Sequence, residues 1–370
     1  MAFDHNPEAL EACRIDIVAA DDAVARAAWS DYVADHKEAT AFHRLEWIDA
    51  ITEATGHESC LLMARTAAEP GDDAVICGVL PCHIIHSPLF GRALVSCGFA
   101  VDGGVLADDP VAAEALVASM WKLAERRSCP TAELRGGMVP LDPSWHRNTD
   151  SYLGFVRALA ENDEAELLAI SRKQRAEVRK AIKLRDTGDL TVETGAGQRD
   201  RDWHYRVYSE SVRNLGTPVF PRALFAAVLD HFGEDADILS VLHQGEPVAS
   251  VLSLYHRGTV MPYWGGGVWD ARRLRANDLM YYALMNHARD HGCHRFDFGR
   301  SKTGTGAAAF KKNWGFDGVS LTYAVRTASG AEPRDTNPLS PKYQARIRLW
   351  QKLPLSLANR LGPMIAKGLG

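Results

Sequence analysis

The sequence has 370 residues, which suggests two domains at the usual size of about 150 residues each. Hydrophobic residues make up 46% and charged residues 24%, and this ordinary globular composition excludes a disordered, collagen-like or fibrous chain. The formal net charge of -5 argues against a protein whose whole surface clamps nucleic acid.

The sequence contains no sign of secretion or membrane insertion. No uninterrupted apolar run reaches the roughly 18 residues that a membrane-spanning helix needs. The N-terminal residues include acids and a proline, where a secretory signal has a basic start and an apolar block. The cysteines are odd in number, scattered and never in C-x-x-C spacing, which indicates free thiols in a reducing compartment. We therefore expect a cytoplasmic protein.

Residues 1–150 alternate helical patterns with short apolar runs, which predicts an N-terminal mixed α/β domain. Residues 42–55 and 108–127 show the apolar recurrence of helices, and the second has Asp109 as its cap and Pro110 in its first turn. Apolar runs bounded by turn residues predict strands at 59–66, 74–85 and 131–137.

Residues 151–326 predict a second domain with a similar order of elements. Residues 236–266 predict a three-stranded meander. A helix over 277–292, capped by Asn277 and stopped at Gly292, precedes a strand at 294–301. Earlier helices are predicted at 172–185, 201–215 and 221–232. The predicted fold class is therefore mixed α/β with a structural duplication, followed at 327–370 by a polar linker and a basic amphipathic tail.

Two stretches concentrate positive charge on an otherwise acidic chain. Residues 172–185 hold a run of lysines and arginines against the single acid Glu177. Residues 341–370 hold six basic residues and no acid. Such local concentrations indicate a specific anionic partner rather than non-specific charge attraction.

The order of meander, helix and strand is that of the acyl-CoA N-acyltransferase (GNAT) superfamily, in which two central strands splay to admit a thioester. That fold normally holds the CoA pyrophosphate on the bare amides of a glycine-containing turn at a helix start. The corresponding residues 271–278, ARRLRAND, contain no glycine. The sequence therefore does not predict an intact pyrophosphate cradle, and CoA-dependent N-acyl transfer stands as an alternative function.

Three motifs resemble the FemAB family of aminoacyl-tRNA-dependent peptidyltransferases, which are tandems of two GNAT-like domains. They are RKQRAEVRKAIK at 172–183, RNLGTPVFPRALF at 213–225 and FDFGRSKTGTGAAAFKKNWGF at 296–316. The sequence looks in particular like the FemAB-like branch that accompanies exosortase (PEP-CTERM) exopolysaccharide systems in Gram-negative bacteria. The resemblance covers residues 150–326 and, more loosely, the first half of the chain.

The resemblance assigns Phe310 and Lys311 to the family's Phe-Lys pair, in which the lysine faces the ester oxygen that becomes an oxyanion. A preorganised cation in a water-poor cleft stabilises that charge by a few kcal/mol. Asp297 is the third catalytic candidate, either accepting a proton from the attacking amine or holding Arg300. The alternative for Lys311 is a solvated lysine in a loop.

The resemblance implies some of the substrate-binding candidates, and position in the sequence suggests the others. Arg213 matches the family's phosphate-binding arginine, and arginine forks suit a diphosphate; the alternative is a helix-end arginine that complements the helix dipole. On the predicted helix at 172–185, Arg172, Arg175, Arg179 and Lys183 recur at spacings of three and four and form one basic stripe. In the family this helix is placed to contact RNA or another anion; the alternative is a solvated helix face. Tyr263 and Trp264, before the triple glycine, either line the cleft or belong to the aromatic core. The full set is Arg213, Arg222, Arg300, Ser301, Tyr263, Trp264, Arg172, Arg175 and Arg179.

We expect no metal site. His287, His291, Cys293 and His294 include a helical i, i+4 histidine pair, but the set lacks a further ligand or an acidic base placed as in known zinc sites.

The predicted function is transfer of an aminoacyl or other acyl group to an amine or hydroxyl of a cell-envelope or exopolysaccharide precursor. The acyl donor, aminoacyl-tRNA or acyl-CoA, is a co-substrate and no bound cofactor is expected. The acceptor would be a nucleotide-linked or lipid-linked glycan or peptide, and the protein a monomer. The basic tail either contacts the inner face of the cytoplasmic membrane or packs against the second domain. A non-catalytic scaffold of exopolysaccharide systems is the second alternative.

Overall fold

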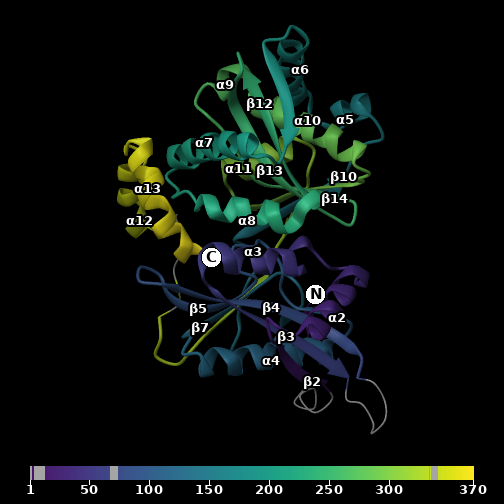
Figure 1. Ribbon diagram of the computed structural model, residues 1–370, viewed down its shortest axis with the longest axis vertical. Coiled ribbons are helices and arrows are strands. Elements are labelled where there is room, and N and C mark those ends of the chain that lie inside the picture. Colours follow the sequence, from purple (N-terminus) through teal and green to yellow (C-terminus); the bar gives the residue numbers. More distant parts are fainter. Residues whose placement is uncertain (1, 4–12, 67–73, 333, 335–340) are drawn as a thin grey trace. The chain divides into compact units, whose positions relative to one another are not determined.

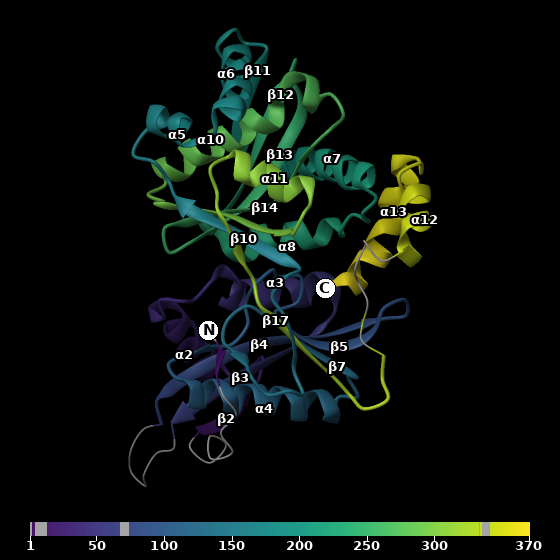
Figure 2. The same ribbon diagram turned by 180° about the vertical axis from the view of Figure 1, so that it is seen from behind.

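The computed structural model describes residues 2–3, 13–66, 74–332, 334 and 341–370, which form two units (Figure 1, Figure 2). Unit 1 comprises Met1–Thr149, Leu321–Thr336 and Lys367–Gly370, and unit 2 comprises Asp150–Ser320 and Asn337–Ala366. The first boundary lies beside the one expected at residue 150. The later boundaries differ from the predicted ones, because residues near 325 pair with strands of unit 1 and the tail is divided between the units.

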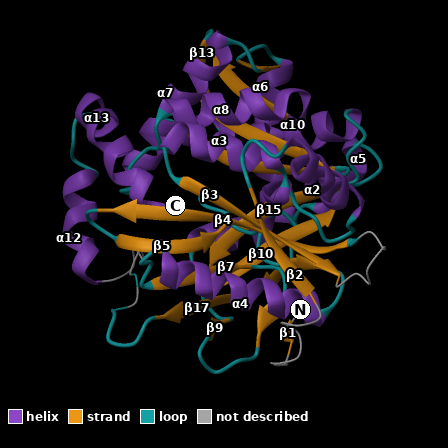
Figure 3. Cartoon of the chain, turned by 60° about the horizontal axis from the view of Figure 1, so that its bottom comes forward, coloured by secondary structure: helices purple, strands orange, loops and turns teal. Residues whose placement is uncertain are grey.

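Unit 1 is built on one mixed sheet with helices on both faces (Figure 3). In spatial order its strands are β2 (Cys13–Val18), β3 (Glu58–Thr66), β4 (Ile76–Ser87), β5 (Gly91–Ser96), β7 (Thr131–Arg135), β17 (Tyr323–Thr327) and β9 (His146–Asn148). The short β6 (Leu106–Ala107) pairs with β4, and β1 (Ala2–Phe3) pairs with β8 (Val139–Pro140). All contacts are antiparallel except β5–β7, β1–β8 and a bridge beside β6.

Alternation along the strands of unit 1 creates two apolar faces. Leu62 and Leu80 pack under helix α4 (Pro110–Arg126), whereas Leu61 and Val79 face helices α2 (Ala23–Asp35) and α3 (Leu45–Thr55), with the short 3-10 helix η1 (Ala41–His43) before α3. Helix α4 begins as predicted, because the Asp109 carboxylate accepts the Ala112 amide at 2.8 Å.

Unit 2 repeats this sheet. Its strands, in spatial order, are β11 (Leu190–Gly195), β12 (Ala236–His243), β13 (Glu246–His256), β14 (Thr259–Gly267), β15 (Arg295–Lys302), β10 (Tyr152–Ala158) and β16 (Gly318–Ser320). The predicted meander is confirmed: Gln244 and Gly245 both have positive φ (53° and 80°) in the two-residue turn that joins β12 to β13. In both units four strands form an antiparallel meander, and the fourth strand pairs in parallel with the next strand of the sheet: β14 with β15 here, and β5 with β7 in unit 1. The predicted duplication of a mixed α/β fold is therefore confirmed.

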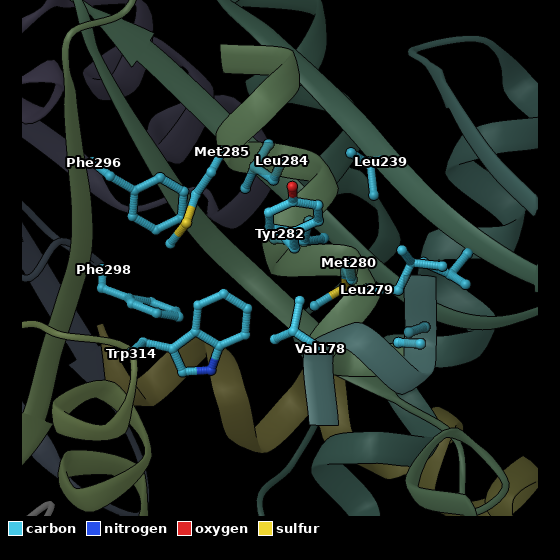
Figure 4. Packing of buried hydrophobic residues seen from close by; sticks show 14 of the residues in the cluster. Val178, Leu239, Leu279, Met280, Tyr282, Leu284, Met285, Phe296, Phe298 and Trp314 are labelled. Atoms are coloured by element: carbon cyan, nitrogen blue, oxygen red, sulfur yellow. The ribbon is translucent and has the colours of Figure 1, made fainter. Parts of the chain in front are cut away.

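Helices cover both faces of the unit 2 sheet. Helices α7 (Gln198–Leu215) and α8 (Arg222–Phe232) lie on one face. The other face carries α6 (Arg172–Asp186) and α10 (Ala276–Asp290), whose apolar residues pack with strand residues such as Phe296 and Phe298 (Figure 4). Unit 2 also contains α5 (Asp163–Ala169), α9 (Ala271–Leu274), α11 (Gly306–Asn313) and the 3-10 helix η2 (Gly233–Asp235).

Two local predictions in this unit need correction. Helix α10 begins at Ala276, with Arg275 in the left-handed region (φ 57°) as its cap, so Asn277 lies inside the first turn. The alternative of a loop lysine at 311 is wrong, because residues 306–313 form helix α11, capped by the Thr305 hydroxyl, which accepts the Ala308 amide. The predicted stop of α10 at Gly292 is confirmed by its positive φ of 76°.

The C-terminal helices α12 (Pro341–Trp350) and α13 (Leu355–Ala366) belong to unit 2 and are followed by the 3-10 helix η3 (Lys367–Leu369). The Gln351 side-chain amide donates to the Asn214 carbonyl, and the Asn359 amide donates to the Ser209 hydroxyl, both at 3.2 Å. The tail thus packs on the end of α7, one of the two predicted arrangements. Within the described residues, no helix is both long and apolar enough to cross a membrane.

Candidate active site

Strands β14 and β15 separate shortly after they meet. They are nine and eight residues long, yet they pair only through Thr259 with Arg295 and Val260 with Phe296. The predicted splay of two central strands is therefore present in unit 2. In unit 1 the matching seam is closed, because β5 and β7 pair over three residues and the Arg135 amide then donates to the Ser96 hydroxyl at 2.8 Å. The opening for a substrate lies in unit 2.

A cavity of about 240 Å³ lies at the open end of β14. Helices α7, α9, α10 and α11 contribute side chains, and the strand contributes bare backbone. The lining residues are Ser211, Asn214, Leu215, Gly266, Gly267, Val268, Trp269, Arg272, Asn277, Tyr281 and Phe310. Glycine is required on the strand, because a β-carbon at Gly266 would lie 2.3 Å from the Ser211 hydroxyl and one at Gly267 would lie 2.6 Å from Asn277 Oδ1.

Two polar groups of α10 face this region. The buried Oδ1 of Asn277 has no hydrogen-bond partner within the described part of the chain. Burial raises the pKa of the Tyr281 phenol to about 12, so this group stays a neutral hydrogen-bond donor at physiological pH. Sequence reasoning missed Ser211, Asn214 and Tyr281 as site residues. The sequence did offer a signal. Ser211 and Asn214 are three residues apart on α7, and Asn277 and Tyr281 are four residues apart on α10, so each pair lies on one face of its helix, and β14 ends in three glycines.

Lys311 is held as a partly buried cation. Its Nζ donates to the carbonyls of Arg300 at 2.9 Å and Gly299 at 3.2 Å, and lies 5.4 Å from the ring centres of Phe155 and Phe298. Burial lowers its pKa to about 8, the negative charge of Asp297 opposes this shift, and the positive charge of Arg300 adds to it. The lysine is therefore not a solvated surface group.

The neighbours of Lys311 have separate local roles. Phe310 lines the cavity, whereas Lys311 is not among its lining residues within the described chain. Asp297 accepts the Gly299 amide at 2.8 Å, and the Arg300 guanidinium lies 4.6 Å from the Tyr152 ring centre. Ser301, also a sequence candidate, is buried in β15.

The two aromatic candidates on β14 lie beside an irregular step in the strand. The pairing skips Tyr263, so this residue is bulged between Pro262 and Trp264. The Trp264 side chain is only 4% exposed and packs edge-to-face on Phe225 at 5.0 Å. The structure thus places Trp264 in an aromatic core, the alternative to a cleft-lining role.

The arginines predicted to bind a diphosphate already have protein partners. Arg213, in the last turn of α7, donates to the Gln351 carbonyl at 3.2 Å, and its buried Nε has no partner among the described residues. Arg222 is exposed, pairs with Asp202 at 2.6 Å and lies 4.2 Å from the Tyr205 ring centre. Arg222 is therefore the more accessible of the two for an anionic substrate.

The basic stripe on α6 is shorter than predicted. Arg172 and Arg179 are exposed, as is Lys183. Arg175 instead turns back and donates to the carbonyls of Leu168 and Ile170, both at 3.0 Å. Arg175 therefore binds backbone carbonyls of the chain that precedes α6 and does not belong to the exposed basic stripe.

The histidine cluster at the far end of α10 is tied to an aspartate. The Asp237 carboxylate receives the Tyr255 hydroxyl at 3.0 Å and lies 2.6 Å from His287 Nε2, while His291 stacks on the Tyr255 ring. Among the residues that the structure describes, no group of three His, Cys, Asp or Glu side chains is arranged to hold a metal ion.

A serine–histidine chain lies in the core of unit 2. The Ser240 hydroxyl donates to Ser250 at 3.0 Å, and Ser250 lies 3.1 Å from His204 Nδ1. All three side chains are buried, and burial lowers the His204 pKa to about 3. Because no substrate reaches these side chains from solvent, the chain is part of the core rather than a nucleophilic site.

Comparison with known protein families gives a match that lies within unit 2. Residues 172–312 match the family model described as "Acetyltransferase (GNAT) domain". Unit 2 contains a GNAT-type acyltransferase domain. No curated protein sequence matches the chain.

Solved structures extend the likeness to both units. The crystal structure of FemX has a TM-score of 0.62 at 14% identity, covering 84% of this chain and 96% of that one. A tandem GNAT protein from the clavulanic acid biosynthesis pathway has a TM-score of 0.53 at 11% identity, and the match covers 86% of this chain and 100% of that one. The C-terminal domain of a putative lysylphosphatidylglycerol synthetase from Agrobacterium fabrum has a TM-score of 0.52 at 15% identity, and the match covers 82% of this chain and 92% of that one. These likenesses show a tandem GNAT fold.

The GNAT domain raises the question of whether the start of α10 fits the pyrophosphate of acyl-CoA. The Asp278 carboxyl lies in the first turn of α10, accepts the Gln174 amide at 2.6 Å, and has its pKa raised to about 6 by burial. Arg275 is bound by Glu177 at 2.5 Å and by the carbonyl of Arg272. A pyrophosphate here would meet two carboxylates, so these residues do not fit the usual cradle.

Proposed function

We propose that the protein is a FemAB-type acyltransferase that transfers an aminoacyl or other acyl group to an amine or hydroxyl of a cell-envelope or exopolysaccharide precursor. The observation that carries the proposal is Lys311, a partly buried ammonium fixed on the carbonyls of Gly299 and Arg300 at the end of β15, past the point where β14 and β15 separate. The likeness to FemX in fold supports the same assignment.

Aminolysis of an ester needs few protein groups. The nitrogen of a neutral amine attacks the acyl carbon, the C–N bond forms, and the carbonyl oxygen takes negative charge. Two of the three N–H donors of Lys311 face protein carbonyls, which leaves the third for this oxygen. Collapse of the adduct breaks the C–O bond, and the proton lost by nitrogen ends on the departing hydroxyl. Holding donor and acceptor together lets this sequence proceed as one effectively unimolecular step.

The basic side chains suggest what the donor is. Arg172, Arg179 and Lys183 are exposed on one side of α6 and would contact the phosphates of an aminoacyl-tRNA. Asp278, in the first turn of α10, and Glu177 of α6, which pairs with Arg275 beside that turn, disfavour the pyrophosphate of acyl-CoA. We therefore place aminoacyl-tRNA ahead of acyl-CoA as the donor.

CoA-dependent N-acyl transfer is the second candidate, because the family model that matches residues 172–312 is that of a GNAT acetyltransferase. The two are separated by a thermal melt with acetyl-CoA. A ligand at about 100 times its Kd stabilises a protein by about 2.7 kcal/mol, which raises Tm by several degrees. We expect Tm to stay unchanged in millimolar acetyl-CoA, with a CoA-binding GNAT enzyme as the positive control. A rise of several degrees would favour the CoA-dependent reaction.

The proposal includes a contact between the C-terminal helices and an anionic membrane. On α13 the small residues Ala358 and Gly362 are buried, while Leu357, Leu361 and Met364 are exposed on the opposite side. Within the described residues of this tail the exposed charged side chains are all positive, among them Arg346, Arg348, Lys352 and Arg360. An apolar face on a basic tail matches an acidic phospholipid surface, where envelope precursors of the exosortase-associated type would be assembled.

Vesicle sedimentation tests this contact. We expect the protein to bind vesicles containing phosphatidylglycerol and not pure phosphatidylcholine. Leu357→Gln with Met364→Gln should weaken binding by about tenfold or more, because each side chain loses roughly 1 kcal/mol of apolar burial. Val319→Gln, at an equally exposed apolar position on β16, is the matched control. Equal binding by all three proteins would refute the contact.

A further inference from the structure

The segment Lys367–Gly370 is bound in a pocket of unit 1 through its backbone oxygens. His57 Nε2 donates to the Lys367 carbonyl at 2.8 Å. Arg334 donates through one nitrogen to the Gly368 carbonyl and through the other to the Gly370 oxygen at 3.1 Å. The segment is therefore held through its main-chain oxygens.

A second arginine converges on the same oxygen. Arg135 donates to the Gly370 oxygen at 3.2 Å and is itself only 6% exposed. It is held in place by Glu133, at 2.9 Å from its Nε, and by the Ala100 carbonyl at 3.1 Å. A buried guanidinium held by these two partners is a preorganised donor for a ligand oxygen, and not a side chain that must be ordered on binding.

The shape of the pocket requires glycine at two positions of the bound segment. A β-carbon on Gly368 would lie 2.3 Å from the Ser87 hydroxyl, and one on Gly370 would lie 2.5 Å from the Phe99 ring. Both glycines are buried, whereas Leu369 between them is partly exposed. The pocket therefore accepts a Gly-x-Gly backbone and leaves the middle side chain free.

We propose that this part of unit 1 is a binding site for a short Gly-x-Gly peptide, and that residues 367–370 occupy it as an internal ligand which an external peptide of the same kind displaces. Its residues belong to unit 1, whereas Lys311 and the cavity beside β14 belong to unit 2, so the inference does not rest on the proposed function. The tethered segment competes at an effective concentration of roughly millimolar, which masks the site from weak ligands.

The test is peptide binding by the full-length protein, measured by fluorescence anisotropy with Lys-Gly-Leu-Gly labelled at its amino end. Gly368→Ala with Gly370→Ala prevents the internal segment from seating and leaves the pocket unchanged. We expect this variant to bind the peptide at least about tenfold more tightly than the wild type. Adding Arg135→Gln to the same variant should abolish binding, and Lys-Ala-Leu-Ala should not compete. Equal binding by variant and wild type, or by both peptides, would overturn the proposal.

A second measurement uses the wild-type protein and does not depend on the folding of any variant. Hydrogen–deuterium exchange of residues 367–370 is followed with and without several millimolar Lys-Gly-Leu-Gly. Displacement predicts faster exchange in this segment with Lys-Gly-Leu-Gly and no change with Lys-Ala-Leu-Ala. Unchanged exchange with both peptides would show a fixed structural element and not an exchangeable ligand.

Discussion

Lys311→Ala should lower formation of the transferred product by about 10²–10³-fold, because it removes the one donor assigned to the developing oxyanion. The measurement is mass spectrometry of envelope glycans and muropeptides from a deletion strain that carries the wild-type or a variant gene. A mass that is missing from both the deletion and the Lys311→Ala strain identifies the transferred group and its dependence on this lysine.

The matched control is Lys312→Ala. Lys312 is the next residue of α11 and is exposed, so its loss changes charge and helix propensity without touching the Gly299 and Arg300 carbonyls. We expect Lys312→Ala to restore the product fully. Full restoration by Lys311→Ala as well would remove the lysine from the mechanism and favour a scaffold role for the protein.

The pH dependence separates a cationic lysine from a lysine that acts as a base. Burial lowers the pKa of Lys311 to about 8, so the protonated fraction falls as pH rises through 8. A cationic role predicts that the rate, divided by that of Lys311→Arg, which stays protonated, falls about eightfold between pH 7.5 and 9. A ratio that rises over this range would assign the neutral amine of Lys311 as a base instead.

Acid should destabilise both units through one buried histidine in each. Burial lowers the pKa of His83 to about 4 and that of His204 to about 3, from 6.5. Because the unfolded chain binds protons at these residues below pH 6.5 and the folded chain does not, folding stability is complete above that pH and falls below it. Between pH 7 and 4.5 each histidine should cost about 2.5 kcal/mol of unfolding free energy.

Urea unfolding at pH 7 and pH 4.5 measures this cost. His204→Gln and His83→Gln should each lose about 2.5 kcal/mol less than the wild type on acidification, whatever their stability at pH 7. His146→Gln, at an exposed position of β9, is the control and should follow the wild type. Losses equal to that of the wild type in both buried variants would mean that these histidines are protonated in the folded protein.

Local sequence determined the elements and, through their order, the duplicated fold. The Asp109–Pro110 start of α4, the Gln244–Gly245 turn and the amphipathic pattern of α6 depend on residues within a few positions of one another. Short-range capping and turn chemistry is sufficient for such elements, so they could be predicted before any tertiary contact was known.

Long-range packing decided the site. Whether β14 and β15 pair or part depends on β-strand register and on Phe296 and Phe298 packing under α10, contacts that no local motif encodes. The rings around Lys311 are Phe298 of β15, more than ten residues earlier in the sequence, and Phe155 of β10, more than a hundred residues earlier. Arg213 became a partner of the tail for the same reason, because the identity of a side chain fixes what it can bind and only the tertiary structure fixes what lies within its reach.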